Sequence, residues 1–245
     1  MTVQIIEVLR RSEQGMTRPF ICRGDDDEIY FVKGIGAGRR SQICEWIAGN
    51  LGLALGLPIA PFEIVEVPEE LLQIPSVLSL SELGSGEAFG SKRQDDAMEL
   101  NMTVIHAIPE ALQQDVLTFD WWIRNNDRLL TPTGGNPNLF WNPRDRELIV
   151  IDHNQAFDAE FDSNNFLDYH IFHSQKHQVF GDMLRRQDYT QRFFSALNHW
   201  HGICAGIPKA WFFTDMEMTV PVNFSLDGAY AMLEAYKKED FWNTL

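Results

Sequence analysis

The sequence predicts an α+β fold in which strands come first along the chain and helices dominate the later part. Short segments rich in β-branched and aromatic residues, bounded by turn residues, occupy the first part of the chain. From about Pro109 onward, apolar residues recur at helical spacing instead. Because the two patterns are segregated rather than alternating, the sequence favours α+β over a parallel βαβ sheet.

The N-terminal strands are expected around Val3 to Val8, at Phe20 to Arg23 and at Ile29 to Lys33. An acidic run, residues 24–28, separates the last two. Its Gly and Asp residues are typical of turns, so we interpret it as a solvated hairpin turn in preference to a metal-binding loop.

A glycine-rich run, Gly34 to Gly38, joins the third strand to a predicted helix that Gly56 and Pro58 end. The apolar face of this helix consists of Cys44, Ile47, Ala48, Leu51 and Leu55. A dinucleotide-binding signature would need a third glycine where Arg39 stands. Two interpretations stay open: helix N-terminal amides that contact a phosphate, and a merely flexible connection, which we favour.

Further elements follow in order. Phe62 to Val67 alternates like a strand, and the Ser- and Gly-rich residues 79–91 are expected to form a loop with one more strand. A helix through Val116 and Phe119 should end near Asn125, before turn residues 131–137 and a strand pair at 138–141 and 148–151. Two helical faces come last, Phe193, Leu197, Trp200 and Cys204, then Ala229, Met232, Leu233 and Tyr236 behind a Ser225 N-cap.

The composition and net charge of the chain limit its possible functions. The chain has 245 residues, 44% of them hydrophobic, which suits one large domain or two joined lobes. Its net charge of −15 predicts no binding to nucleic acid and none to anionic membranes. An anionic substrate would therefore need a local cationic or metal site.

The cysteines and the N-terminus predict a cytoplasmic location. Cys22, Cys44 and Cys204 form no CxxC pair, so a disulfide framework or a thiolate zinc site is not supported and a reducing compartment is expected. The N-terminus lacks the features of a signal peptide. The longest uncharged stretch, Trp46 to Phe62, is shorter than the roughly 20 apolar residues of a membrane span.

The residues that could carry chemistry lie between Phe119 and Asp158. A helix leads into Asn126-Asp127-Arg128, Asn138 opens one strand, and Asp152 ends the next. A strand pair that brackets a loop in this way should bring Asp127, Asn138 and Asp152 together. Phosphoryl transfer requires such a set: one carboxylate to orient a hydroxyl and accept its proton, and a carboxylate and an amide oxygen to hold Mg²⁺.

These motifs resemble a known family. Asn-x-Asp-Arg, Asn-Pro-Asn-Leu and Ile-Asp-His are similar to the catalytic region of HipA-like kinases, a branch of the protein-kinase-like superfamily. The resemblance implies that Asp127 is the catalytic base, that Asn138 and Asp152 are metal ligands, and that ATP and Mg²⁺ are the cofactors. His153 would stand where kinases have the Phe of Asp-Phe-Gly.

The N-terminal half carries the resemblance too. Phe31-Val32-Lys33 is similar to the kinase strand whose lysine holds the α and β phosphates, and Glu45 resembles the helix Glu that pairs with it. The resemblance covers roughly residues 20–160. It implies a two-lobed protein-kinase-like fold, with a small, mainly β lobe at about 1–105 that contains one helix and a larger helical lobe at about 106–245.

The sequence also departs from the kinase pattern. Asp127 and Asn138 are 11 positions apart, whereas protein kinases have the compact Asp-x-x-x-x-Asn. No glycine-rich phosphate lid is visible, and Gly15 is a weak substitute. The Ala-Pro-Glu motif is absent. We interpret Arg128 as a structural anchor of its loop in preference to a phosphate ligand.

We therefore expect a kinase that transfers the γ-phosphoryl group of ATP to a hydroxyl. The resemblance favours a protein Ser or Thr as acceptor, and a small-molecule hydroxyl stays open. The alternative is a catalytically weak or inactive kinase fold that binds nucleotide or serves as a scaffold. A third hypothesis is a metal-dependent hydrolase that uses His170, His173 and His177. Trp121 and Trp122 are expected in the core rather than in a base-stacking platform.

Overall fold

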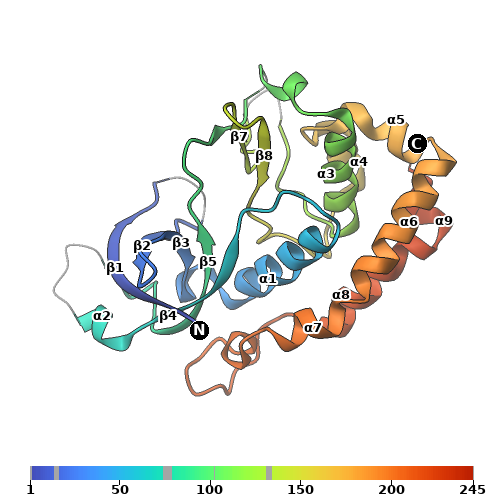
Figure 1. Cartoon of the computed structure of the whole chain (residues 1–245). Helices are drawn as coiled ribbons and strands as arrows, with labels where there is room; N and C mark the ends of the chain where they lie inside the picture. Colours follow the sequence, from blue (N-terminus) through green and yellow to red (C-terminus); the bar gives the residue numbers. More distant parts are fainter. Residues whose placement is uncertain (1, 14–16, 74–78, 102, 131–133, 245) are drawn as a thin grey trace. The chain divides into compact units, whose positions relative to one another are not determined.

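The computed structural model describes residues 2–13, 17–73, 79–101, 103–130 and 134–244 (Figure 1). The chain divides into two compact units, each made of several segments. The barrel unit comprises Met1–Trp46, Ala60–Asp95 and Ile207–Asn223. The helical unit comprises Ile47–Ile59, Asp96–Gly206 and Phe224–Leu245. Helix α1 (Arg39–Ala54) contributes residues to both.

The barrel unit is built from strands that close on themselves in the order β1-β2-β3-β5-β4 (Figure 1). Their bounds are β1 Val3–Arg11, β2 Phe20–Gly24, β3 Ile29–Lys33, β4 Phe62–Val67 and β5 Gly86–Lys92. Neighbouring strands are antiparallel except β1 and β4, whose parallel pairing closes the barrel. The interior is filled by buried apolar side chains that include Ile5, Phe20, Val32 and Val65.

Connections complete the barrel unit. The glycine-rich run forms a 3₁₀ turn, η1 (Ile35–Ala37), and α2 (Glu69–Gln73) follows β4. Residues 207–223, with η4 (Lys209–Phe212), return to the barrel from the C-terminal part of the chain. There Trp211 is fully buried and its indole Nε1 donates to the carbonyl of Glu87 over 2.9 Å.

The helical unit contains a sheet in the order β6-β7-β8 and the remaining helices. The strands are β6 Met98–Glu99, β7 Leu139–Asn142 and β8 Glu147–Val150. The helices are η2 Ile105–Ala107, α3 Glu110–Trp122, α4 Ser163–Tyr169, η3 His173–Gln175, α5 Lys176–Phe180, α6 Met183–Leu197, α7 Trp200–Ala205, α8 Leu226–Leu233, η5 Glu234–Lys237 and α9 Glu239–Trp242. None of the helices in the described residues is long and apolar enough to cross a bilayer.

Aromatic side chains form the centre of the helical unit. Trp122 stacks on Phe193 with ring centroids 4.1 Å apart, and its Nε1 donates to the carbonyl of Leu233 over 2.8 Å. Trp121 packs against the rings of Phe166 and Phe180. The prediction that both tryptophans belong to the core is confirmed.

The mixed α and β architecture is confirmed, and the N-terminal strands, α1, α3 and the β7–β8 hairpin lie where the sequence predicts them. The predicted Ser225 cap is also present, since its hydroxyl accepts from the Gly228 amide over 3.0 Å. The face predicted from Phe193 to Cys204 is divided between α6 and α7. The lobes at about 1–105 and 106–245 stay a prediction, and the compact units differ from them in being discontinuous.

Candidate active site

The segment after α3 carries the candidate base. Helix α3 ends at Trp122, and Asn125 closes the following turn: its amide N–H donates to the Asp120 carbonyl over 2.9 Å, and its side-chain Nδ2 to Asp120 Oδ1 over 2.8 Å. The Asn125 side-chain oxygen lies 3.4 Å from the Asp127 amide nitrogen, which donates to it. These bonds fix the backbone on which the half-buried Asp127 is mounted.

Asp127 and Asn138 are in direct contact. Asn138 Nδ2 donates to Asp127 Oδ2 over 2.9 Å. An ionised carboxylate only accepts hydrogen bonds, so the amide must turn its nitrogen toward Asp127. The Asn138 side-chain oxygen, Oδ1, is therefore directed away from Asp127.

The register of the hairpin places Asp152 one residue beyond the position opposite Asn138. Leu139 pairs with Val150, so Asn138 and Ile151 are the next opposed positions, and the Ile151 amide donates to the Asn138 carbonyl over 3.2 Å. Asp152 follows directly and is half-buried. Asn138 thus precedes one strand of the pair and Asp152 follows the other, at the same end.

Both residues have left-handed backbones, with φ of 52° at Asn138 and 57° at Asp152. Asn and Asp are the non-glycine residues that adopt this conformation most readily. Strained conformations of this kind persist where the surroundings hold them, and they cluster at functional sites.

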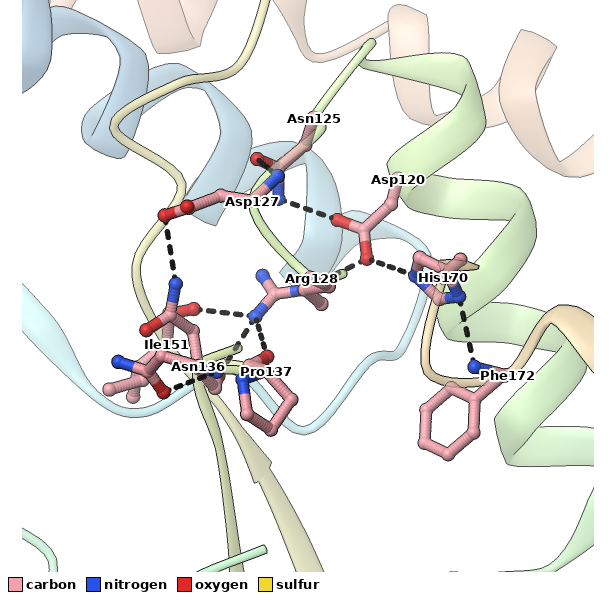
Figure 2. Close-up of polar contacts among 10 residues, drawn as sticks. Asp120, Asn125, Asp127, Arg128, Asn136, Pro137, Ile151, His170 and Phe172 are labelled. Carbon is pink, nitrogen blue, oxygen red and sulfur yellow. Dashed lines mark hydrogen bonds and ion pairs between the residues drawn. The ribbon is translucent and has the colours of Figure 1, made fainter. Parts of the chain in front are cut away.

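Arg128 holds the two ends of the hairpin (Figure 2). Its Nη1 donates to the carbonyls of Asn138 and Ile151, each over 2.8 Å, and more weakly to that of Pro137 over 3.3 Å. Its Nε donates to Asp120 Oδ2 over 2.7 Å. Since Arg128 is fully buried, the prediction that it anchors the loop is confirmed.

A buried pair accompanies this arginine. Asp120 and His170 are both fully buried, and His170 Nε2 lies 3.1 Å from Asp120 Oδ2 (Figure 2). Burial alone would raise the pKa of Asp120, but the Arg128 guanidinium and the bond from His170 lower it below its usual value. Burial lowers the pKa of His170 despite the nearby carboxylate. His170 Nδ1 accepts from the Phe172 amide over 3.1 Å, so the neutral ring carries its proton on Nε2.

The barrel unit contains the candidate phosphate-binding lysine. Lys33 ends β3, Glu45 lies on α1, and Lys33 Nζ forms an ion pair with Glu45 Oε1. Both residues are buried, with 6% and 3% of their surface exposed. The Gln42 side chain donates to the Lys33 carbonyl over 2.6 Å, which ties the strand end to the helix.

The glycine-rich run is an ordered turn and not a flexible connection. The amides of Ile35 and Gly36 donate to the carbonyls of Leu83 and Glu82 over 3.1 and 2.7 Å. A Cβ at Gly34 would lie 2.0 Å from the Leu83 carbonyl oxygen. Close backbone approach therefore explains the glycine at this position. Gly15 and residues 131–133 lie outside the described residues.

A family comparison decides the classification. The family model described as HipA-like kinase matches residues 5–245. The chain belongs to the HipA-like kinase family. Membership supports a kinase-type function, that of a phosphotransferase.

A solved structure agrees with this fold. The crystal structure of a Helicobacter pylori proinflammatory kinase, CtkA, matches with a TM-score of 0.50 and 11% sequence identity, covering 100% of this chain and 98% of that chain. At this identity the likeness shows the fold alone. No curated protein matches the sequence.

Within this HipA-like kinase, the sequence did not identify Asp120 as part of the site. Its signal is a lone carboxylate inside the apolar run from Phe119 to Ile123, a position that burial makes costly unless a cation pairs with it. His170, considered as a metal ligand, instead bonds Asp120 and the Phe172 amide. The described residues contain no group of three or more His, Cys, Asp or Glu side chains placed to hold a metal ion, so the hydrolase hypothesis has no support from the structure.

Proposed function

We propose that this protein is an ATP- and Mg²⁺-dependent kinase that transfers the γ-phosphoryl group to a hydroxyl. The observation that carries the proposal is the bond from Asn138 Nδ2 to Asp127 Oδ2, in a loop tied through Arg128 to the residue before Asp152. The proposal is supported because the buried Arg128 joins the segments that carry the carboxylate and amide groups that phosphoryl transfer requires.

The donor set fits magnesium. Hard cations prefer oxygen ligands, and Mg²⁺ is commonly held by one or two carboxylates together with substrate phosphates and water. Asn138 Oδ1, turned away from Asp127, and the Asp152 carboxylate would be the protein ligands. Bound there, the ion would neutralise charge on the phosphates.

The remaining roles follow from the chemistry of the side chains. Asp127 orients the acceptor hydroxyl and accepts its proton at the carboxylate. Lys33 contacts the α and β phosphates, and Glu45 holds its ammonium in place. The acceptor we favour is a protein Ser or Thr. In the part of the chain that the structure describes, Cys22, Cys44 and Cys204 form no disulfide; this supports our proposal of a cytoplasmic location.

The test is a transfer assay with γ-labelled ATP and Mg²⁺ against Ser/Thr peptide libraries and small alcohols, with nucleotide binding measured by calorimetry. We expect the wild type to bind and transfer. Asp127→Asn should bind ATP with similar affinity but transfer about 100-fold or more slowly, because the proton acceptor is lost. The control is Asp240→Asn, an exposed carboxylate on α9.

The assay also separates the alternatives. Equal rates for Asp127→Asn and wild type would exclude Asp127 as the base. Tight nucleotide binding by the wild type without transfer to any acceptor would instead support the inactive nucleotide-binding or scaffold module.

A further inference from the structure

The buried Arg128 side chain is linked to the segments that carry the three candidate catalytic residues of the helical unit, Asp127, Asn138 and Asp152. It is adjacent to Asp127 in sequence, and its Nη1 binds the Asn138 carbonyl and the carbonyl of Ile151, which precedes Asp152. The Ile151 amide donates to that same Asn138 carbonyl. The spacing of the two proposed metal ligands therefore depends on where the guanidinium lies.

Asp120 determines where the guanidinium lies. Its Oδ2 accepts from Arg128 Nε, and its Oδ1 accepts from Asn125 in the same loop (Figure 2). His170 Nε2–H completes the set of donors, and its other nitrogen accepts from the Phe172 amide. With a neutral imidazole, the cluster holds one positive and one negative charge, so the buried charges balance.

The shape of the Arg128 side chain matters as well as its charge. Arg128 Nη2 is buried and has no hydrogen-bond partner in the described part of the chain. A buried N–H without an acceptor lowers stability, but an apolar side chain in place of Arg128 alone would cost more, because it would leave the buried Asp120 carboxylate and two backbone carbonyls without their donor. A lysine has a single nitrogen, so it could not bind Asp120 from one atom and both carbonyls from another, as Nε and Nη1 of the planar guanidinium do.

We infer that Asp120 and Arg128 are positioning residues for phosphoryl transfer, which hold Asn138 and Asp152 at the separation that a shared cation requires. The inference rests on the proposed function. It concerns residues that touch neither nucleotide nor acceptor and act only through the backbone of the metal-binding segment.

The test compares Arg128→Lys and the near-isosteric Asp120→Asn with wild type and with Arg185→Lys, an exposed arginine on α6. Affinity for Mn²⁺, as a probe for Mg²⁺, is measured by electron paramagnetic resonance in the presence of a non-hydrolysable ATP analogue. Transfer rates are measured as a function of Mg²⁺, and analogue binding is measured without metal.

We expect Mn²⁺ affinity and kcat to fall about 10- to 100-fold in both variants, while metal-free nucleotide affinity stays unchanged. Arg185→Lys should match the wild type. A general loss of folding would instead weaken all three readouts, and Asp120→Asn serves as the decisive variant if Arg128→Lys does not fold. Wild-type Mn²⁺ affinity in folded Asp120→Asn would overturn the inference. Absence of transfer by the wild type would count against the proposed function, while the Mn²⁺ titration would still judge the positioning role.

Discussion

At the scale of single residues, Asn138 combines two requirements. Its backbone is left-handed, and its amide is oriented by Asp127. Replacing it by Ala strains the backbone and removes Oδ1, whereas replacing it by Gly removes only the side chain. We expect Asn138→Gly to be about 1 kcal/mol more stable than Asn138→Ala.

Both Asn138 variants should lose Mg²⁺-dependent transfer to a similar extent. Urea unfolding and the transfer assay, performed on the same preparations, measure the two effects separately. If the transfer rates of the two variants changed in parallel with their stabilities, so that Asn138→Gly were nearly as active as the wild type, the side-chain oxygen would be dispensable.

His170 predicts a pH dependence of stability. Its pKa in the folded protein lies below the usual value, so the unfolded chain binds more protons as the pH falls below about 6.5. Stability should therefore decrease from pH 7 to pH 5, by at most about 1.4 kcal/mol per pH unit from this group. The lowered pKa of Asp120 acts in a separate window, since its contribution is lost only in more acidic solution, below about pH 4.

Urea titrations at pH 7, 6 and 5 measure this effect. His170→Gln, which keeps a donor for Asp120, should show a flatter profile than the wild type. His106→Gln, at an exposed histidine, should keep the wild-type slope. Equal slopes for His170→Gln and the wild type would show that the imidazole does not remain neutral in the folded protein.

At the scale of elements, the turn between β3 and α1 depends on glycines for two different reasons. Gly34 lies against the Leu83 backbone, whereas a Cβ at Gly38 would have open space, but φ at Gly38 is 84°. Gly34→Ala should destabilise by about 3 kcal/mol, since backbone must move. Gly38→Ala should cost about 1 kcal/mol, from its φ alone.

Gly202, an exposed residue in α7 with open space for a Cβ, provides the control. Gly202→Ala should stabilise by roughly 0.5–1 kcal/mol, because alanine has the higher helix propensity. Thermal or urea unfolding measures all three. If Gly34→Ala lowered the free energy of unfolding no more than Gly38→Ala does, the turn would not pack closely on residues 82–83.

Elements differ in how well the sequence predicts them. The β7–β8 hairpin is found almost to the residue because its β-branched and aromatic residues flank a clear turn. β6 has two residues and no periodicity, and only its pairing with β7 defines it as a strand. The break between α6 and α7 lies at Asn198 and His199, within a continuous apolar stripe that does not reveal it.

At the scale of the whole molecule, the net charge of −15 predicts salt dependence. Self-repulsion weakens the compact state, and salt screens it. We expect the melting temperature at pH 7 to rise by about 2–4 °C between roughly 0.05 and 0.5 M NaCl, which corresponds to about 1 kcal/mol. Near pH 5, close to the isoelectric point of about 4.8, the rise should disappear. An equal salt effect at both pH values would exclude net charge as its cause.

The sequence by itself determined the class of the molecule and the residue types of its candidate site. Local periodicity and turn chemistry were sufficient for the mixed α and β architecture, and the resemblance of the motifs and their order to those of HipA-like kinases selected Lys33, Glu45, Asp127, Asn138 and Asp152 as candidates. These signals are local or linear, so they are readable without coordinates.

Only the tertiary structure revealed the contacts between segments that are far apart in the sequence. The parallel pairing of β1 with β4 closes the barrel, and Trp211 brings a C-terminal segment back to the Glu87 carbonyl. The Asp120–Arg128–His170 cluster depends on contacts between α3, the loop after it and the segment after α4. No local pattern encodes these contacts, because each arises from burial that exists only once the chain has folded.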